Sequence, residues 1–297
     1  MQVDICELLK PTRLDRVLRD RFPEWGRQAI QQLISSRQVQ VNGKTVWLAS
    51  WQVKNGDQIT LLTTPEAKPT PPQGFDPRWL LAEEADLLVI NKPAGLLSEA
   101  PRFRETANLL NLARARFGEL ILFHRLDRDT SGIMLLTRPG PINRYLDRAF
   151  KAGLVKKTYV AVVATPNQLE SEGTITARLD QHPRRRDMMA VVTRGGKHAV
   201  TDYRIIATGP DKHQQLVELH PQTGRTHQLR VHLAHRHAPI LGDRLYGDEA
   251  SADRLLLHAA QLVLPALDGY PVRTYAAPMP EAFEDWDSLV SGDRYRG

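Results

Sequence analysis

The nine residues His-Arg-Leu-Asp-Arg-Asp-Thr-Ser-Gly, at positions 124–132, lie between two short apolar runs. These runs, residues 120–123 and 133–136, predict strands. Loops at strand ends often carry chemistry, so Asp127 is the first candidate for a catalytic group. The same residues also suit a solvated turn, with a capping Asp and with Gly132 at positive φ.

Outward from this stretch, the chain from residue 79 onward is dominated by short strand patterns. Apolar or alternating runs predict strands at residues 87–90, 158–163, 173–177, 189–193, 200–206, 216–220 and 255–264. A helical face interrupts them and ends near Gly153, a typical cap residue. Because strands and helices do not alternate regularly, the pattern argues against a doubly wound parallel sheet. We expect an α+β domain with a mixed, largely antiparallel sheet and flanking helices around a basic cleft.

Residues 1–62 predict a separate small α+β module. Helical spacing at residues 14–22, ended by Pro23, and at residues 29–34 is followed by an alternating run and the hairpin signal Asn42-Gly43. Two helices followed by short strands are typical of a compact nucleic-acid-binding module. The candidate RNA contacts on or beside these elements are Arg13, Arg16, Arg27 and Lys44. A solvated helix face with mixed charges is the alternative interpretation.

Residues 63–78 contain five prolines and predict an extended linker, which leaves residues 79–297 as the catalytic domain. The 297-residue chain has 41% hydrophobic and 25% charged residues, the balance of a soluble globular protein. Its net charge of +6 favours a polyanionic partner such as nucleic acid. With Cys6 as its single cysteine the chain has no internal disulfide, and no apolar run approaches the roughly 18 residues of a membrane span. We therefore expect a cytoplasmic protein that does not enter the membrane.

Two further stretches carry candidate site residues. Residues 221–233 follow a predicted strand and lead into a helix, so Arg225 lies at or just before a helix N-terminus. The helix dipole disfavours a cation there, so we expect a carboxylate partner, although a solvated surface arginine is the alternative. Tyr159, in the strand pattern, is either a packing residue or an aromatic that stacks on a base. Asp127 and Asp129 also suggest a paired-carboxylate glycosidase as an alternative.

Other polar clusters are less specific. Four histidines crowd residues 227–237, but no cysteine and no nearby acid completes a set of zinc ligands, so we expect no metal site. A run of three arginines forms either a plain exposed loop or a basic patch suited to phosphates, and its members are Arg184, Arg185 and Arg186.

Residues 124–132 resemble the HRLDxxTSG signature of the RluA-type pseudouridine synthases. Residues 157–159 are similar to the KxY motif of that family, and residues 221–233 to its second signature. Residues 182–203 resemble its RluD branch, and residues 14–57 resemble the RNA-binding domain named after ribosomal protein S-four.

The resemblance implies that the protein isomerises selected uridines in RNA to pseudouridine without a cofactor. It implies that Asp127 is catalytic, that Arg225 pairs with Asp127 and keeps it ionised, and that Tyr159 lies against the target base. Asp127 would act by attacking the sugar or the base, or by removing a sugar proton. The resemblance further implies RNA contacts from the signature residues His124, Arg125 and Thr130.

One departure from the family is the stretch at residues 97–101, which places Glu99 near a loop expected to face RNA. Because the RluC and RluD branches of the family carry such an N-terminal module, the resemblance implies large-subunit ribosomal RNA as the target, with transfer RNA as the alternative. A non-catalytic RNA-binding or ribosome-assembly protein and a nucleic-acid N-glycosylase are the competing functions. We expect the protein to act as a monomer.

Overall fold

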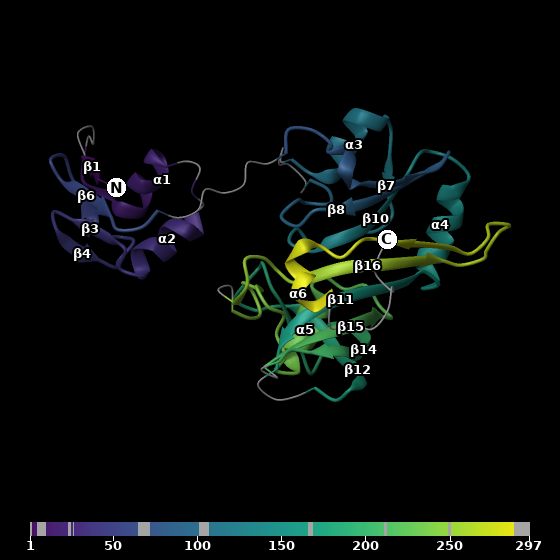
Figure 1. Cartoon of the computed structure of the whole chain (residues 1–297). Coiled ribbons are helices and arrows are strands. Elements are labelled where there is room, and N and C mark those ends of the chain that lie inside the picture. Colours follow the sequence, from purple (N-terminus) through teal and green to yellow (C-terminus); the bar gives the residue numbers. More distant parts are fainter. Residues whose placement is uncertain are drawn as a thin grey trace. The chain divides into compact units, whose positions relative to one another are not determined.

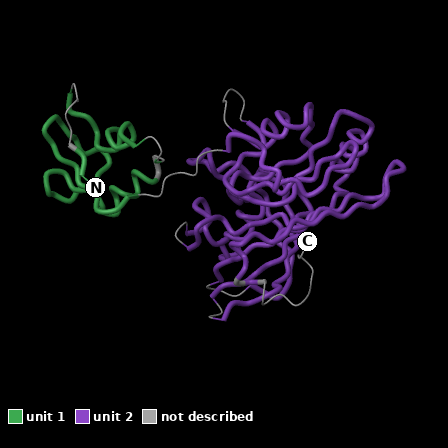
Figure 2. Tube along the Cα trace, turned by 45° about the horizontal axis from the view of Figure 1, so that its top comes forward, with its two compact units in different colours: residues 1–71 green, residues 72–297 purple. Residues whose placement is uncertain are grey.

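The computed structural model describes residues 2–4, 10–22, 25, 27–64, 72–100, 107–165, 169–210, 213–248 and 251–287. The chain forms two compact units, residues 1–71 and residues 72–297, and each is considered by itself (Figure 2). Cys6, Pro23 and residues 65–71 of the expected linker lie outside the described residues. No helix in the described part of the chain is long and apolar enough to cross a membrane.

Unit 1 is a small α+β module, as the sequence predicts. Its described elements are β1 (Gln2–Asp4), β2 (Thr12–Arg13), α1 (Leu14–Arg21), α2 (Arg27–Ser35), β3 (Val39–Val41), β4 (Lys44–Val46), β5 (Gln52–Val53) and β6 (Gln58–Leu61). Four strands form a sheet in the order β1-β6-β3-β4, and β2 pairs with β5. The apolar faces of α1 and α2 are buried against this sheet, for example through Leu18, Ile34 and Val39.

The predicted turn at residues 42–43 joins β3 to β4. Asn42 and Gly43 both adopt positive φ, at 49° and 75°, as a tight hairpin turn between twisted strands requires. The Asn42 side chain also donates from Nδ2 to Asp57 Oδ1 at 2.9 Å and accepts the Gln58 amide at 2.8 Å. The turn is therefore fixed to β6 as well as to its own hairpin, which confirms the hairpin prediction.

Unit 2 contains the remaining elements of the chain (Figure 1). They are β7 (Leu80–Glu83), β8 (Leu87–Lys92), α3 (Leu109–Phe117), β9 (Ile121–Leu122), β10 (Ser131–Thr137), α4 (Ile142–Lys151), β11 (Lys156–Ala164), β12 (Glu172–Gln181), β13 (Met189–Val191), β14 (Lys197–Thr208), β15 (Gln214–Pro221), α5 (Gln228–His235), β16 (Leu257–Leu264), β17 (Arg273–Ala276) and α6 (Glu284–Asp287), with short 3-10 turns at Pro77–Trp79 and Glu281–Phe283.

One large sheet organises unit 2. Its central strand order is β13-β12-β14-β15-β11-β16-β10-β8-β7, and β17 and β9 add to β16 and β10. Among the described strands, β10 and β16 form the one parallel pair, and every other pairing is antiparallel. The expected mixed, largely antiparallel sheet is confirmed.

Helices cover both faces of the sheet around β8 and β10. Side chains of successive strand residues point to opposite faces, so Val89 and Leu135 pack with α4, whereas Ile90 and Met134 pack with α3. These strands therefore read as continuous apolar runs rather than as an alternation. On the other half of the sheet, α5 packs over β12 and β14, where its Val231 is buried.

The segment expected as a linker extends to residue 78, but the structure places residues 72–78 in unit 2. Phe75 is the reason, because its ring is buried and lies edge-on against Trp79 and Phe117. A proline-rich composition concealed this aromatic anchor in the sequence.

A row of paired residues crosses four strands at the middle of the sheet. Gly132 of β10 pairs with Ala259 of β16, which pairs with Tyr159 of β11, which pairs with Leu219 of β15. Gly132 has φ +116°, and a Cβ at this position would lie 2.2 Å from the Ala259 carbonyl oxygen. The glycine that closes the signature thus allows two backbones to approach where the candidate site begins.

We predict that Gly132→Ala destabilises unit 2 by about 3 kcal/mol or more, because an overlap with rigid backbone adds to the strain of positive φ. Gly153→Ala is the matched control, since Gly153 follows α4 with φ +68° but has no atom within 4 Å of an added Cβ. The control should lose only about 1–2 kcal/mol. Urea denaturation followed by fluorescence measures both values, and equal losses would contradict the close-approach argument.

Candidate active site

The loop that carries Asp127 is held by two buried side chains from distant segments. Ser98 Oγ donates to the Leu126 carbonyl at 2.7 Å and accepts the Leu126 amide at 3.1 Å. The buried Lys92 Nζ donates to the Arg128 carbonyl at 3.0 Å and to the carbonyls of Pro93 and Leu96 at 2.9 and 2.8 Å. These contacts fix the backbone on both sides of Asp127.

Lys92 has no solvent around its ammonium group. Burial lowers the pKa of Lys92 to about 7, and the nearby carboxylates of Asp129 and Asp127 act in the opposite direction. The three carbonyl acceptors match the three N–H donors of an ammonium group. Lys92 therefore joins the turn after β8 to the Asp127 loop.

The Asp127 side chain lies in a cavity of about 510 Å³ in unit 2 and is 27% exposed. The volume falls within the usual range for small-ligand sites. Tyr159, Pro221 and residues 223–230 contribute to the same cavity wall. The three stretches that the sequence marked as candidate sites thus meet in one place.

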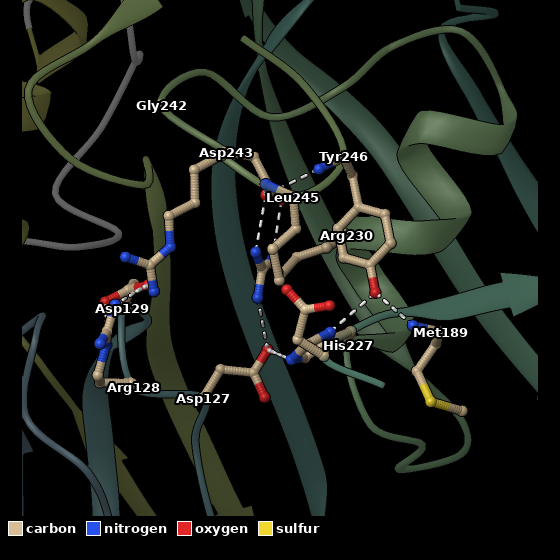
Figure 3. A network of polar contacts seen from close by, with 12 residues as sticks. Asp127, Arg128, Asp129, Met189, His227, Arg230, Gly242, Asp243, Leu245 and Tyr246 are labelled. Carbon is tan, nitrogen blue, oxygen red and sulfur yellow. Dashed lines mark hydrogen bonds and ion pairs between the residues drawn. The ribbon is translucent and has the colours of Figure 1, made fainter. Parts of the chain in front are cut away.

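The guanidinium beside Asp127 is that of Arg230, and the predicted pairing of Arg225 with Asp127 is wrong. Arg230 Nη1 lies 3.5 Å from Asp127 Oδ2, and the Arg230 side chain is only 4% exposed (Figure 3). Helix α5 begins at Gln228, so Arg230 lies in its first turn and on its buried face. Arg225 precedes the helix in an exposed loop, where its Nε donates to the His198 carbonyl at 3.0 Å.

Asp243 holds Arg230 in place from the other side. The Arg230 Nε and Nη2 atoms donate to the two Asp243 oxygens at 2.8 and 2.7 Å, a two-pronged pair. Asp243 Oδ1 also accepts the backbone amides of Leu245 and Tyr246. Burial alone would lower the pKa of Arg230, but the hydrogen bonds and charge of Asp243 outweigh it and raise the pKa. Arg230 therefore remains a cation.

The phenol of Tyr159 and the imidazole of His124, both in the cavity wall, are electrically neutral. Burial, with a contribution from the Asp127 charge, raises the pKa of Tyr159 above its usual range, so Tyr159 is a neutral phenol. Burial also lowers the pKa of His124 to about 3, with Lys157 acting in the same direction. His124 Nε2 accepts the Leu135 amide at 3.0 Å, and the ring stacks on Phe150.

The RNA contacts of His124 and Thr130 remain predictions. Both residues line the cavity, and His124 Nε2 accepts a strand amide. The Thr130 side chain is buried, and its Oγ1 has no hydrogen-bond partner within the described residues. Arg125, by contrast, is exposed and donates to Glu99 at 3.1 Å, so the departure at Glu99 engages Arg125 directly.

The other predicted RNA contacts lie outside this cavity. Arg184, Arg185 and Arg186 are exposed in the loop between β12 and β13, and Arg185 pairs with Asp187 at 3.1 Å. In unit 1, Arg16 and Lys44 are exposed, and Arg13 forms an exposed pair with Asp15 at 2.9 Å. Arg27 begins α2, and its side chain lies outside the described part of the structure.

The histidines at residues 227–237 have separate environments. His227 lies 3.9 Å from Asp127, and the buried His232 contacts Thr201 at 3.0 Å, while His235 and His237 are exposed. Within the described residues, no group of three or more His, Cys, Asp or Glu side chains converges as metal ligands would.

Sequence reasoning missed four residues of the site, and these are Lys92, Arg230, Asp243 and Tyr246. Arg230 did give a signal, because it is a charged residue between Leu229 and Val231, which turn out to be buried. A charge in such a run suggests a buried, paired ion. Nothing in the sequence indicated which carboxylate the arginine would meet.

We predict that Asp243→Ala lowers the free energy of unfolding by roughly 3–5 kcal/mol, because it leaves the buried Arg230 cation without its main partner. Asp147→Ala is the control, since it removes an exposed pair with Lys151 and should cost about 0.5 kcal/mol or less. Guanidinium denaturation measures both losses. Similar losses for the two variants would show that the Arg230–Asp243 pair is not important for stability.

Comparisons with known proteins show similarity over most of the chain. A model of the family described as RNA pseudouridylate synthase matches residues 86–235, and an S4 domain model matches residues 12–59. The ribosomal large subunit pseudouridine synthase D of Xylella fastidiosa is 35% identical over 91% of this chain and 86% of its own length. The RNA pseudouridine synthase YlyB of Bacillus subtilis is 32% identical over 100% of this chain and 99% of its own length.

Two solved structures are similar to this chain in fold and sequence. The human RNA pseudouridylate synthase domain containing 4 is 30% identical and superposes with a TM-score of 0.54, covering 70% of this chain and 90% of its own. The human RNA pseudouridylate synthase domain containing 1 is 27% identical with a TM-score of 0.59, covering 71% of this chain and 87% of its own.

Proposed function

Because this chain belongs to the RNA pseudouridylate synthase family, we propose that it isomerises uridines of large-subunit ribosomal RNA through an essential carboxylate, that of Asp127. The observation that carries this proposal is the half-buried Asp127 in a cavity, with Arg230 beside it and Tyr159 in the cavity wall. The reaction is an isomerisation, so the residues need only open one bond, reorient the base and close another.

In this reaction the N1–C1′ bond of the uridine breaks, the uracil turns, and C5 bonds to C1′. The C5 proton then leaves, and N1 gains a proton. The Asp127 carboxylate contacts the nucleotide, and Arg230, 3.5 Å away, holds the carboxylate in place. Tyr159, as a neutral phenol, packs against the uracil ring. A base stacked inside a duplex cannot reach this cavity, so the target nucleotide must be unpaired or extruded.

Arg225 receives a different role from the one the sequence suggested. It lines the cavity from the exposed loop before α5, away from the Asp127 ion pairs. An exposed guanidinium at the rim of an RNA site suits a phosphate oxygen. We therefore assign it, with Arg125 and the arginines at residues 184–186, to contacts with the RNA backbone.

Unit 1 supports RNA binding through an exposed aromatic side chain. Trp47 is 54% exposed, and the Arg37 guanidinium lies 5.8 Å from the centroid of its ring. Exposed rings and guanidinium planes stack on unpaired bases without strong sequence preference. Arg16 and Lys44 on the same unit add exposed positive charge.

Large-subunit ribosomal RNA is favoured as the substrate by the names of similar proteins. Relatives from Xylella fastidiosa and from Xanthomonas campestris, the latter 33% identical over 96% of this chain, are both called ribosomal large subunit pseudouridine synthase D. A ribosomal RNA substrate also supports action in the cytoplasm. We further propose that the protein acts as a monomer.

We predict that Asp127→Asn lowers tritium release from [5-³H]uridine-labelled ribosomal RNA by at least roughly 10³-fold, because the amide lacks the reactive oxygen. Asp129→Asn is the control, since the Asp129 carboxylate binds Arg128 and Arg244 instead of lining the cavity. It should keep most of the activity. Free uracil as the product would indicate an N-glycosylase, and RNA binding with neither product would indicate an assembly role.

We predict that a strain lacking this protein loses pseudouridine at sites in large-subunit ribosomal RNA, as measured by sequencing after carbodiimide modification of total RNA. Complementation with the parent chain should restore these sites, and complementation with the Asp127→Asn variant should not. Loss of a transfer-RNA site with unchanged ribosomal RNA would contradict the proposed target.

A further inference from the structure

A chain of polar contacts joins the Asp127 carboxylate to a backbone amide through two side chains (Figure 3). The Met189 N–H donates to Tyr246 Oη at 2.7 Å, and Tyr246 Oη lies 2.8 Å from His227 Nδ1. The other ring nitrogen of His227, Nε2, lies 3.9 Å from Asp127 Oδ2. The first residue of β13, the loop after Asp243 and the entry to α5 thus all contribute to the surroundings of Asp127.

This chain of contacts favours one tautomer of His227 over the other. Tyr246 Oη already accepts the Met189 amide, and the phenolic proton needs an acceptor of its own. Within the described residues, the acceptor that the structure places next to Tyr246 Oη is His227 Nδ1. Nδ1 therefore accepts this proton, and the proton of the neutral imidazole lies on Nε2, which faces Asp127.

The imidazole is neutral at pH 7. Burial lowers the pKa of His227 below its usual range, the facing Asp127 carboxylate raises it by less, and the Arg230 cation lowers it further. The more distant carboxylates of Asp243 and Asp187 have smaller raising effects. The Tyr246 phenol, whose own pKa burial raises, completes the surroundings of the ring as a neutral group.

The backbone at His227 also departs from the ordinary. His227 directly precedes α5 with φ +54°, and its side chain makes no capping hydrogen bond to the helix. Side-chain-bearing residues rarely adopt this region, and such departures cluster at functional sites. Here the left-handed turn accompanies a ring that bridges Asp127 and Tyr246 instead of capping α5.

We infer that His227 is a positioning residue of the uridine isomerisation, an inference that rests on the proposed function. Its Nε2–H tautomer, set by Tyr246, acts with Arg230 on the same carboxylate oxygen, Oδ2, so that Asp127 presents Oδ1 to the nucleotide. The 3.9 Å separation is longer than a hydrogen bond, and such contacts tighten when substrate enters. The same tautomer excludes His227 as the base that takes the C5 proton, because Nε2 already holds one.

The tautomer is tested directly in the folded protein, without substrate. Long-range ¹H–¹⁵N spectra of protein labelled with ¹⁵N-histidine distinguish Nε2–H from Nδ1–H, and the signal absent from His227→Asn assigns His227. We expect the Nε2–H form at pH 7 in the parent chain and a mixture of both tautomers in Tyr246→Phe. A parent chain with His227 in the Nδ1–H or imidazolium form would overturn the inference.

Kinetic measurements on two substitutions test the positioning role. The more stable of the two variants should have the lower kcat. His227→Asn suits the left-handed backbone better but does not reach Asp127, whereas His227→Gln places an amide N–H near the position of Nε2. We expect His227→Asn to be the more stable variant and His227→Gln to keep the higher kcat. A merely structural role would make kcat follow stability, and that result would overturn the inference.

Tyr246→Phe leaves His227 intact and should lower kcat by about 10-fold or more, with KM for the RNA unchanged, because the carboxylate is less well oriented. His237→Asn is the matched control, since His237 also has positive φ, at 57°, but is exposed. Its rate should equal that of the parent chain. Absence of tritium release from the parent chain would reject the proposed function, and the NMR result could still be interpreted. An active parent chain with His227 in the Nδ1–H form would reject this inference alone.

Discussion

The site depends on one guanidinium held between two carboxylates. Asp243 binds Arg230 with both oxygens in a buried, two-pronged pair, and the remaining nitrogen, Nη1, extends to Asp127. Because the stronger pair is away from the cavity, the weaker contact at 3.5 Å leaves Asp127 accessible. Removing a charge from such a pair costs far more than the pair contributes, so the arrangement constrains the loop at Asp243 and the first turn of α5 together.

Neutral and charged side chains occupy different parts of the cavity. The phenol of Tyr159 and the imidazole of His124 are neutral, and burial is the main cause of the pKa shift of each group. Exposed guanidinium groups, such as those of Arg125 and Arg225, lie where solvent still reaches. Neutral side chains inside the cavity suit the uncharged uracil of a nucleotide. Positively charged side chains at its edge suit the phosphate, which is an anion.

The central sheet explains why segments far apart in the chain form one site. The row from Gly132 through Ala259 and Tyr159 to Leu219 brings β10, β16, β11 and β15 together, although these strands are separated by other elements in the sequence. Ser98 and Lys92 fix the Asp127 loop through hydrogen bonds to its backbone. Strand register, rather than local motif, decides which residues meet.

The sequence by itself determined the local structure, because apolar spacing and turn chemistry act over a few residues. The strands around residues 124–132, the Asn42-Gly43 hairpin and the cap at Gly153 follow from it, as does Asp127 as the candidate carboxylate. The choice of Arg230 over Arg225, the pairing with Asp243, and the association of Phe75 with unit 2 followed only from the tertiary structure. Charge and hydrophobicity in a sequence show that a side chain needs a partner, whereas the three-dimensional packing of α5 and the strands decides which partner lies within reach.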